Sequence, residues 1–408
     1  MRTIFTGGRV FDGTGAAPAE ADVAVEDGRF VEVGAGLDGD EAVDVSGRTL
    51  LPGLFDCHTH VMIGHVDIWR LMQTPFSYRF FDAIRNLRAT LDAGITTVRD
   101  AGGADLGVKQ AVEDGIVPGP RIQLSIRMLS QTGGHGDGLL ASGQRIHLFQ
   151  DYPGSPSAIV DGPDEMRRKV RELVQAGAEV IKVATSGGVL SPRDHPDQPG
   201  FGMEELEVLV AEARAAGLEV MAHAQSTSGI KNALRAGIRS IDHGIYLDDE
   251  AIELMLERGA YLVATLVAPA GVVEAAERGA SIPEASLAKA LEVVTAHRES
   301  FQAAYEAGVN IAMGTDSGVT PHGENLRELQ LMADAGMPPE QVLVATTRAA
   351  AELMGHADEL GTIEPGKRAD VVVVDGDPLE LATLRERIVA VYKDGELVSS
   401  AATPVYAA

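Results

Sequence analysis

The chain has little cysteine, little positive charge and no long apolar run. One cysteine among 408 residues cannot form a disulfide within the chain, which argues against a disulfide-stapled secreted scaffold. No apolar run reaches the ~20 residues that a helix needs to span a bilayer, so we do not expect a membrane protein. The N-terminal segment MRTIFTGGRVFDGTG lacks the basic start and apolar stretch of a signal peptide. We therefore expect a cytoplasmic protein.

The shortage of positive charge also restricts the partners. Lysine and arginine number 34 against 60 aspartate and glutamate residues, which gives a formal net charge of −26. Such a polyanion repels phosphate backbones and anionic membrane surfaces. We expect a small-molecule substrate and neither a nucleic acid nor a membrane as partner. Whether the chain forms a homo-oligomer stays open.

The length predicts more than one folding unit, because a single hydrophobic core stops growing at ~250 to 300 residues. Residues 1–52 and 357–408 alternate short apolar runs with glycine and aspartate turns, as in RADVVVVDGDP and in RIVAVYKDGELV with its Asp-Gly hairpin signal. We expect these two ends to build one small β-sandwich domain together.

Residues 53–356 follow a different pattern, in which short apolar runs alternate with amphipathic stretches rich in alanine, glutamate and arginine. This pattern is typical of parallel strands joined by helices. The predicted strands are residues 51–56, 96–100, 121–125, 180–184, 219–223, 240–244, 261–265 and 310–314. Eight strands, each followed by a helix, favour an α/β fold of the closed (β/α)8 TIM-barrel type, in which catalytic groups lie at the C-terminal ends of the strands.

Four of the eleven histidines stand at the ends of predicted strands. His58 and His60 follow the first strand in FDCHTHV and share one face, although such a pair alone is more often a solvated or core pair. His223 ends the fifth strand and His243 the sixth, while Asp316 follows the eighth. Each could be structural by itself. Their convergence at one rim predicts a metal site, because imidazole and carboxylate are ligands of zinc-like metals.

Lys182 in the fourth strand (EVIKVATSGG) does not fit a metal site as a free amine, because an ammonium group repels a cation. Two explanations stay open. Lys182 could pair with a carboxylate inside the barrel. Alternatively, carbon dioxide could convert it to a carbamate, an anionic ligand with two oxygens that can bridge two metals.

The ordered motifs PGLFDCHTH, IKVATSGG, MAHA, DHG and GTDSG, with the terminal EPGKRADVVVVDGDP, resemble the amidohydrolase superfamily over nearly the whole chain. The resemblance is to its binuclear branch, which is related to imidazolonepropionases and to Xaa-Pro or Xaa-Arg dipeptidases. It implies two divalent metal ions, with zinc as the expected metal. The implied ligands are His58, His60 and Asp316 at one ion, His223 and His243 at the other, and a carboxylated Lys182 between them.

The resemblance also implies hydrolysis of an amide-type carbon–nitrogen bond in a dipeptide, an N-acyl amino acid, a carbamate or a urea. A water shared by two metals ~3.5 to 4 Å apart loses its proton near neutral pH, so a metal-bridged hydroxide is the expected nucleophile. Asp316 would take that proton and pass it to the leaving nitrogen.

Three further residues are candidates for substrate binding. The segment from Arg127 to Gly162 is too long for an ordinary loop. Its SQTGGH motif resembles a motif of the dipeptidase branch in which the histidine, here His135, contacts the reacting or carboxylate oxygens of the substrate, so His135 is a catalytic as well as a binding candidate. The alternative is an exposed histidine in a glycine-rich turn. Gln225 stands where those dipeptidases usually have a tyrosine, so varied leaving amines are expected. His322, after the eighth strand, is either a pocket residue or exposed.

Two other functions remain as alternatives. One is ring opening of a cyclic amide, as in imidazolonepropionase. Deaminase-like members of the superfamily work with one metal and need no lysine in the fourth strand, so Lys182 favours the binuclear hydrolase over them. The other is a non-catalytic scaffold, which the complete ligand set disfavours.

Overall fold

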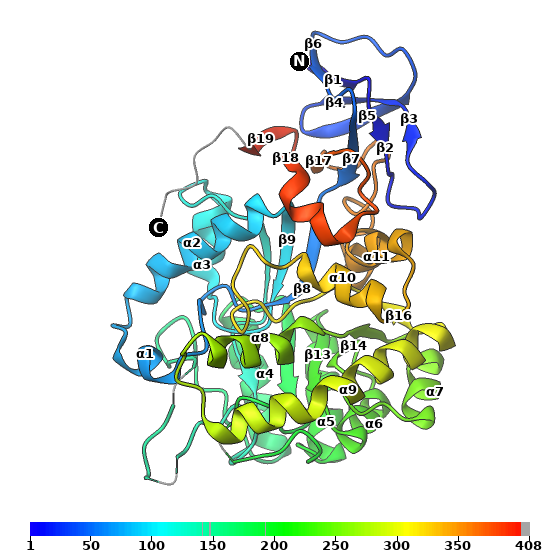
Figure 1. The fold of residues 1–408 in the computed structure, drawn as a ribbon. Helices are drawn as coiled ribbons and strands as arrows, with labels where there is room; N and C mark the ends of the chain where they lie inside the picture. Colours follow the sequence, from blue (N-terminus) through cyan, green and yellow to red (C-terminus); the bar gives the residue numbers. More distant parts are fainter. Residues whose placement is uncertain (141, 147, 192, 401–408) are drawn as a thin grey trace.

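The computed structural model describes residues 1–140, 142–146, 148–191 and 193–400. A large barrel surrounded by helices carries a smaller region of strands that is formed by both ends of the chain (Figure 1). The end of the expected terminal domain, 401–408, lies outside the described residues, as do positions 141 and 147 of the long segment that starts at Arg127.

The barrel wall contains eight parallel strands within the described part of the chain, and the two-residue β11 (Met128–Leu129) pairs alongside β12. Backbone bonds close the ring: the Glu179 N–H donates to the Leu124 carbonyl at 2.8 Å, and the Cys57 N–H donates to the Met313 carbonyl at 2.9 Å. The eight strands are β8 (Leu54–Thr59), β9 (Ile95–Asp100), β10 (Arg121–Leu124), β12 (Val180–Ala184), β13 (Glu219–Ala224), β14 (Ser240–His243), β15 (Tyr261–Val263) and β16 (Asn310–Ile311). The predicted TIM-barrel fold is confirmed.

Helices cover the outside of the barrel (Figure 1). Local sequence signals set their ends: the Ser226 and Asp248 side chains cap the first turns of α6 and α7, which stop at the left-handed Gly237 and Gly259. The helices are α1 (Ile68–Gln73), α2 (Tyr78–Asp92), α3 (Leu106–Glu113), α4 (Pro163–Gln175), α5 (Met203–Ala215), α6 (Thr227–Ala236), α7 (Asp249–Arg258), α8 (Val267–Glu277), α9 (Glu284–Ala307), α10 (Arg327–Asp334), α11 (Pro339–Ala345), α12 (Arg348–Leu353) and the 3-10 helix η1 (Leu381–Arg387).

The terminal strands form two sheets that share one apolar core. Phe5 and Val23 come from the sheet with order β5-β4-β1-β6, and Leu50 and Val371 from the sheet with order β19-β18-β17-β7-β2-β3. This arrangement confirms the expected sandwich of both chain ends. Its strands are β1 (Arg2–Thr6), β2 (Arg9–Val10), β3 (Ala19–Glu20), β4 (Asp22–Glu26), β5 (Arg29–Gly34), β6 (Glu41–Asp44), β7 (Arg48–Pro52), β17 (Val371–Asp375), β18 (Ile388–Lys393) and β19 (Glu396–Ser400).

The chain passes from the sandwich into the barrel at Gly53. Here the prediction of one strand over 51–56 is wrong, because β7 belongs to the terminal sheet and β8 to the barrel. A Cβ atom on Gly53 would lie 2.2 Å from Thr96 Oγ1 and 2.6 Å from Asp370 Cβ, so only glycine fits this crossing. The change of sheet at this residue supports a domain boundary between 52 and 53, which we keep as a proposal.

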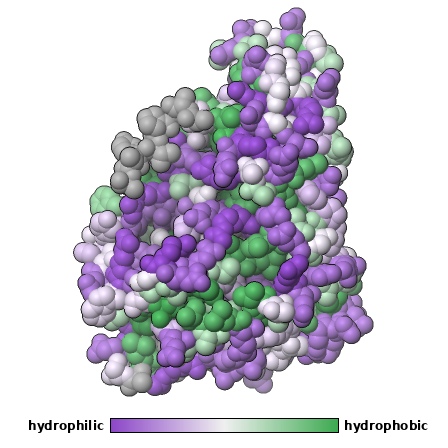
Figure 2. All heavy atoms as spheres, in the orientation of Figure 1, coloured by the Kyte–Doolittle hydropathy of each residue, from purple (hydrophilic) through white to green (hydrophobic). Residues whose placement is uncertain are grey.

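The surface drawn in Figure 2 is mostly hydrophilic, and apolar side chains gather below the centre of the view. None of the helices in the described ranges has both the length and the apolar character that crossing a membrane requires.

A buried ion pair joins the two regions and gives a first prediction. Arg121 in β10 binds Asp370, which is 3% exposed, through two contacts, one of them 3.0 Å from Nη2 to Oδ1. Asp370→Asn removes the more deeply buried of the two carboxylates that pair with Arg121, the other being Asp394 at 2.6 Å, and should lower the free energy of unfolding by about 2 kcal/mol in a urea titration.

The matched control is Glu359→Gln, which removes the exposed partner of Arg29 and should cost less than about 1 kcal/mol. Equal losses in the two variants would mean that the Arg121–Asp370 pair does not hold the sandwich to the barrel.

Candidate metal centre and substrate cavity

His58, His60 and Asp316 form the tightest cluster of metal-ligand side chains in the described residues. One ligand atom from each lies within 4.8 Å of the other two. Asp316 Oδ1 is 3.2 Å from His60 Nε2 and 3.5 Å from His58 Nε2. The Asp316 N–H donates to the His58 carbonyl at 2.7 Å, and Asp316 has a φ of +59°, a left-handed conformation that is uncommon for residues other than glycine.

His223 at the end of β13 and His243 at the end of β14 lie beside this cluster. Their ring centroids are 4.5 Å apart, and the His243 ring is 5.0 Å from that of His58. His243 Nδ1 lies 2.7 Å from Thr265 Oγ1, and His223 Nε2 lies 3.1 Å from the Gly187 carbonyl. These contacts orient both rings and leave His243 Nε2 and His223 Nδ1 to bind a ligand.

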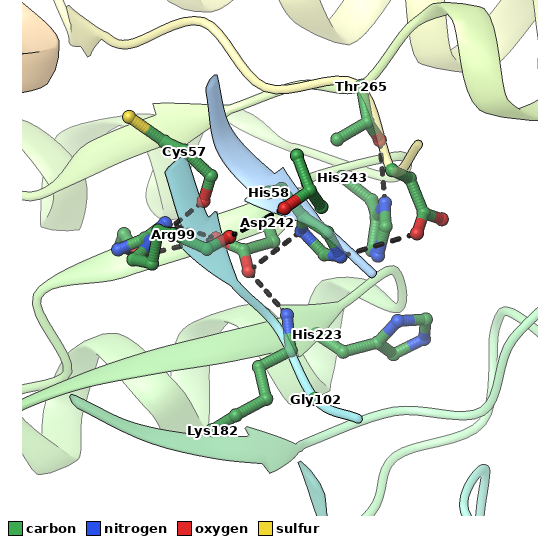
Figure 3. A network of polar contacts seen from close by, with 12 residues as sticks. Cys57, His58, Arg99, Gly102, Lys182, His223, Asp242, His243 and Thr265 are labelled. Carbon is green, nitrogen blue, oxygen red and sulfur yellow. Dashed lines mark hydrogen bonds and ion pairs between the residues drawn. The ribbon is translucent and has the colours of Figure 1, made fainter. Parts of the chain in front are cut away.

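We call the space between these histidine and aspartate side chains the chamber. Lys182 points into it and contacts Asp242 (Figure 3). Its Nζ donates to Asp242 Oδ2, which also lies 3.1 Å from His58 Nδ1. The other carboxylate oxygen of Asp242 accepts from Arg99 Nη2 at 3.3 Å. The structure therefore contains the ion pair that was one of the two explanations for Lys182.

Asp242 and Arg99 were missed in the sequence. Strict alternation along SIDHG would put Asp242 on the face opposite His243, yet both serve the same chamber because His243 turns with a φ of +73° at the strand end. The sequence signal that could have led to Asp242 was Lys182 itself, since a buried ammonium group requires a carboxylate partner.

Burial sets the protonation of the chamber. It lowers the pKa of His58 to about 4, with Lys182 acting in the same direction, and it lowers the pKa values of His223 and His243 well below the usual range. Burial also opposes protonation of His60, but the hydrogen bond and charge of Asp316, together with the charge of Asp100 and the Gly102 carbonyl, outweigh it and raise the His60 pKa.

Asp316 and Lys182 also have shifted pKa values. Burial would raise the pKa of Asp316, but His58 and His60 hold it below its ordinary value. For Lys182, burial lowers the pKa although Asp242 opposes this change. An ionised carboxylate among mostly neutral imidazoles is the state that a divalent cation requires of its ligands. The residues present therefore fit a divalent metal centre of the zinc type.

A cavity of about 350 Å³ opens onto the cluster. Its walls are largely apolar, with a few polar groups that could orient a substrate, the usual composition of a small-molecule site. The apolar walls include Ile63, Phe149, Leu190, Ile245 and Val319, and the polar groups include Arg127, His135, Arg145, Ser191 and Gln225.

Two of the three predicted substrate residues line this cavity. His135 stacks on His223 with ring centroids 4.0 Å apart, and Gln225 Oε1 is buried without a donor among the described residues. His322 is not among the lining residues. Its Nε2 lies 3.0 Å from the Ile63 carbonyl and its Nδ1 3.2 Å from Thr90 Oγ1, so the ring braces the segment after β8.

The long segment that begins at Arg127 supplies much of the cavity wall, as expected of a binding loop. Phe149 places its ring 5.4 Å from that of His60, and the Arg127 guanidinium lies 5.9 Å from the Phe149 ring centroid. Arg145 also lines the cavity and pairs with the buried Asp137. The sequence motif drew attention to His135 alone, so these neighbours were missed.

Comparison with known proteins places this site in a family. The sequence model described as "Amidohydrolase family" matches residues 49–398. Ochratoxinase from Aspergillus niger is 36% identical over 368 residues, which cover 85% of this chain and 75% of that protein. An imidazolonepropionase from Caldanaerobacter subterraneus is 27% identical, covering 88% and 84%. The crystal structure of a Xaa-Pro dipeptidase with bound methionine superimposes with a TM-score of 0.88 at 32% identity, covering 97% and 99%.

The metal centre gives a second prediction. The purified protein should contain close to two divalent ions per chain by elemental analysis, and a chelator should remove them together with the activity. Lys182→Ala should lower the metal content, because it removes the group expected to bridge the ions.

Lys109→Ala, which removes a lysine on the helical layer that pairs with Glu179, should keep the full metal content. A wild-type protein that holds no transition metal after expression in metal-replete medium would contradict the binuclear centre. Full metal content in the Lys182→Ala protein would contradict the bridging role alone.

Asp316 gives a third prediction. Asp316→Asn keeps the shape and one oxygen donor but removes the basic oxygen, so the metal should largely remain while kcat falls by ~10² to 10⁴. Steady-state kinetics and elemental analysis of the same preparation measure both effects. A kcat close to that of the wild type would rule out proton transfer by Asp316.

Proposed function

The chain belongs to the amidohydrolase family, and from this membership we propose that it hydrolyses the amide bond between an apolar acyl group and an amino acid or other small amine. Family membership makes it a metal-dependent hydrolase of carbon–nitrogen bonds. The observation that carries the proposed substrate class is the largely apolar cavity directly over the histidine cluster.

The proposed mechanism assigns a separate task to each group. Divalent metal ions held by His58, His60, His223, His243 and Asp316 would supply Lewis acidity, which polarises the scissile carbonyl and lowers the pKa of the attacking water. Asp316 is ionised in this environment, so a free carboxylate oxygen can accept the proton of that water. The protonated carboxyl can then donate to the departing nitrogen, which must leave as a neutral amine.

The polar groups of the cavity wall would orient the substrate. Gln225 Oε1 can accept a hydrogen bond from a substrate N–H, because it is buried without a donor from the described residues. Arg145 presents a partly exposed guanidinium that suits a substrate carboxylate, while Asp137 holds its other side. His135 lies beside His223, where its ring can hydrogen-bond a polar group of the substrate.

The relatives support this choice. Ochratoxinase and the Xaa-Pro dipeptidase share more sequence identity with this chain than the imidazolonepropionase does. Ring opening of a cyclic amide is the second candidate, and it rests on that weaker likeness. A carbamate on Lys182 is also part of the proposal; its support is the burial of Lys182, which lowers its pKa and so favours the neutral amine that reacts with carbon dioxide.

A substrate panel tests the proposed function and gives a fourth prediction. The metal-loaded protein should be assayed with N-acyl amino acids that carry aromatic or branched acyl groups, with Xaa-Pro dipeptides, with phenylureas and with a cyclic amide. The apolar N-acyl amino acids should give a kcat/KM at least about tenfold above that of matched substrates with a charged acyl side chain, because a charged group in this cavity would lose its hydration.

The Asp316→Asn protein serves as the control for contaminating hydrolases. Faster turnover of the charged analogues, or turnover of the cyclic amide alone, would contradict the proposed substrate class.

A further inference from the structure

A chain of polar contacts holds the back of the His135 ring. His135 Nδ1 lies 3.0 Å from Ser191 Oγ, and Ser191 Oγ contacts Asp194 Oδ1. Asp194 Oδ2 lies 3.7 Å from the same ring nitrogen and has no hydrogen-bond partner in the described part of the chain. Ser191 and Asp194 are both buried, so bulk water does not compete for these contacts.

The protons available on Ser191 and Asp194 determine which group donates in each of these hydrogen bonds. A serine hydroxyl has one proton, and an ionised carboxylate can only accept. Ser191 therefore donates to Asp194, since a carboxylate attracts that proton more strongly than the Gly188 carbonyl 3.0 Å away. The same oxygen must then accept from His135 Nδ1–H. The other ring nitrogen, Nε2, has no bond to a described residue and belongs to a ring that lines the cavity.

Two neighbours, His223 and Gly188, restrict the orientation of the His135 ring. On one face His135 stacks on His223 with an interplanar angle of 14°. Gly188 also lies against the ring, because a Cβ atom there would stand 2.3 Å from His135 Cε1. At Gly187 a Cβ atom would stand 2.9 Å from Asp194 Oδ2. The glycine pair of the TSGG motif therefore makes room for the ring and for the carboxylate behind it.

Lys289 anchors the segment that carries these residues. It extends from α9, is 6% exposed, and its Nζ donates to the backbone carbonyls of Gly188, Ser191 and Asp194 at 2.7, 2.8 and 3.1 Å. Because Lys289 uses only main-chain oxygens, the side chains of Ser191 and Asp194 remain free to act on His135.

We propose that Ser191 and Asp194 are positioning residues, which lock His135 with its proton on Nδ1 and present Nε2 to the substrate as a hydrogen-bond acceptor. The proposal rests on the proposed function only for the identity of the group that Nε2 meets. The orientation and tautomer of the ring are properties of the protein without substrate, so they can be tested separately.

A double-mutant cycle tests the positioning role. Ser191→Ala and Asp194→Ala should each lower kcat/KM by about tenfold, the effect of one lost hydrogen bond. In a His135→Ala background, neither substitution should cause a further loss, because the ring that they act on is gone. Asp194→Asn, which keeps an acceptor oxygen for Ser191, should recover most of the activity lost in Asp194→Ala.

Asp197→Asn is the matched control, since Asp197 lies on the same segment but is exposed and contacts His195. It should leave kcat/KM and the melting temperature unchanged. Losses that add to that of His135→Ala would show a general structural role for Ser191 and Asp194 and would overturn the proposal.

A second measurement does not depend on turnover. In protein labelled with 15N-histidine, His135 should show the Nδ1–H tautomer, and Ser191→Ala should change that signal while melting close to the wild type. An Nε2–H tautomer in the wild type would overturn the proposal even if the enzyme is active. If no substrate of the panel is cleaved but the Nδ1–H signal is present, the proposed function fails and the positioning of His135 stands.

Discussion

The buried carboxylate of Asp242 is the constraint on which the interior of the barrel depends. With Lys182 unmodified, it meets two cations, Lys182 from β12 and Arg99 from β9, and it lies beside His58 Nδ1 on β8. A carbamate on Lys182 would remove the first of these charges and leave Arg99 and His58 as its partners. Arg99 extends the same network to the Cys57 carbonyl at 2.7 Å (Figure 3). A charge buried in this way is tolerated only when its partners are held in place, so four strands are fixed relative to one another around one carboxylate. Because the strands are fixed, the ligand atoms at their ends are held in fixed positions as well.

The same network links the electrostatics of the chamber to its chemistry. Burial disfavours every charge in the chamber, which keeps most of the imidazoles neutral, while the clustered rings keep Asp316 ionised. A divalent cation needs such ligands, and the cavity above them offers apolar walls with few polar groups. Binding energy from an apolar acyl group can therefore hold the scissile bond over the metal centre while the polar groups set its orientation.

The sequence predicted the barrel and the sandwich because both leave periodic signals. Strand ends could be read at His223 and His243, since glycine and helix caps follow them closely. The boundary at Gly53 could not be read as a change of sheet, because the apolar run continues through it and only the contacts with Thr96 and Asp370 show the crossing. Asp242 was missed because a left-handed residue at the strand end breaks the alternation. Ser191 and Asp194 were missed because loop contacts across the barrel mouth leave no periodic pattern.

The central claim is that the strand-end residues form one binuclear metal centre at the floor of the apolar cavity. Anomalous diffraction from crystals grown with metal-replete protein, recorded at the absorption edge of the bound metal, tests this claim most directly. The account predicts two peaks ~3.5 to 4 Å apart, one bounded by His58, His60 and Asp316 and the other by His223 and His243, with density for a group that joins Lys182 to both. A single peak away from these side chains, or an unmodified Lys182 still paired with Asp242 beside two bound metals, would contradict it.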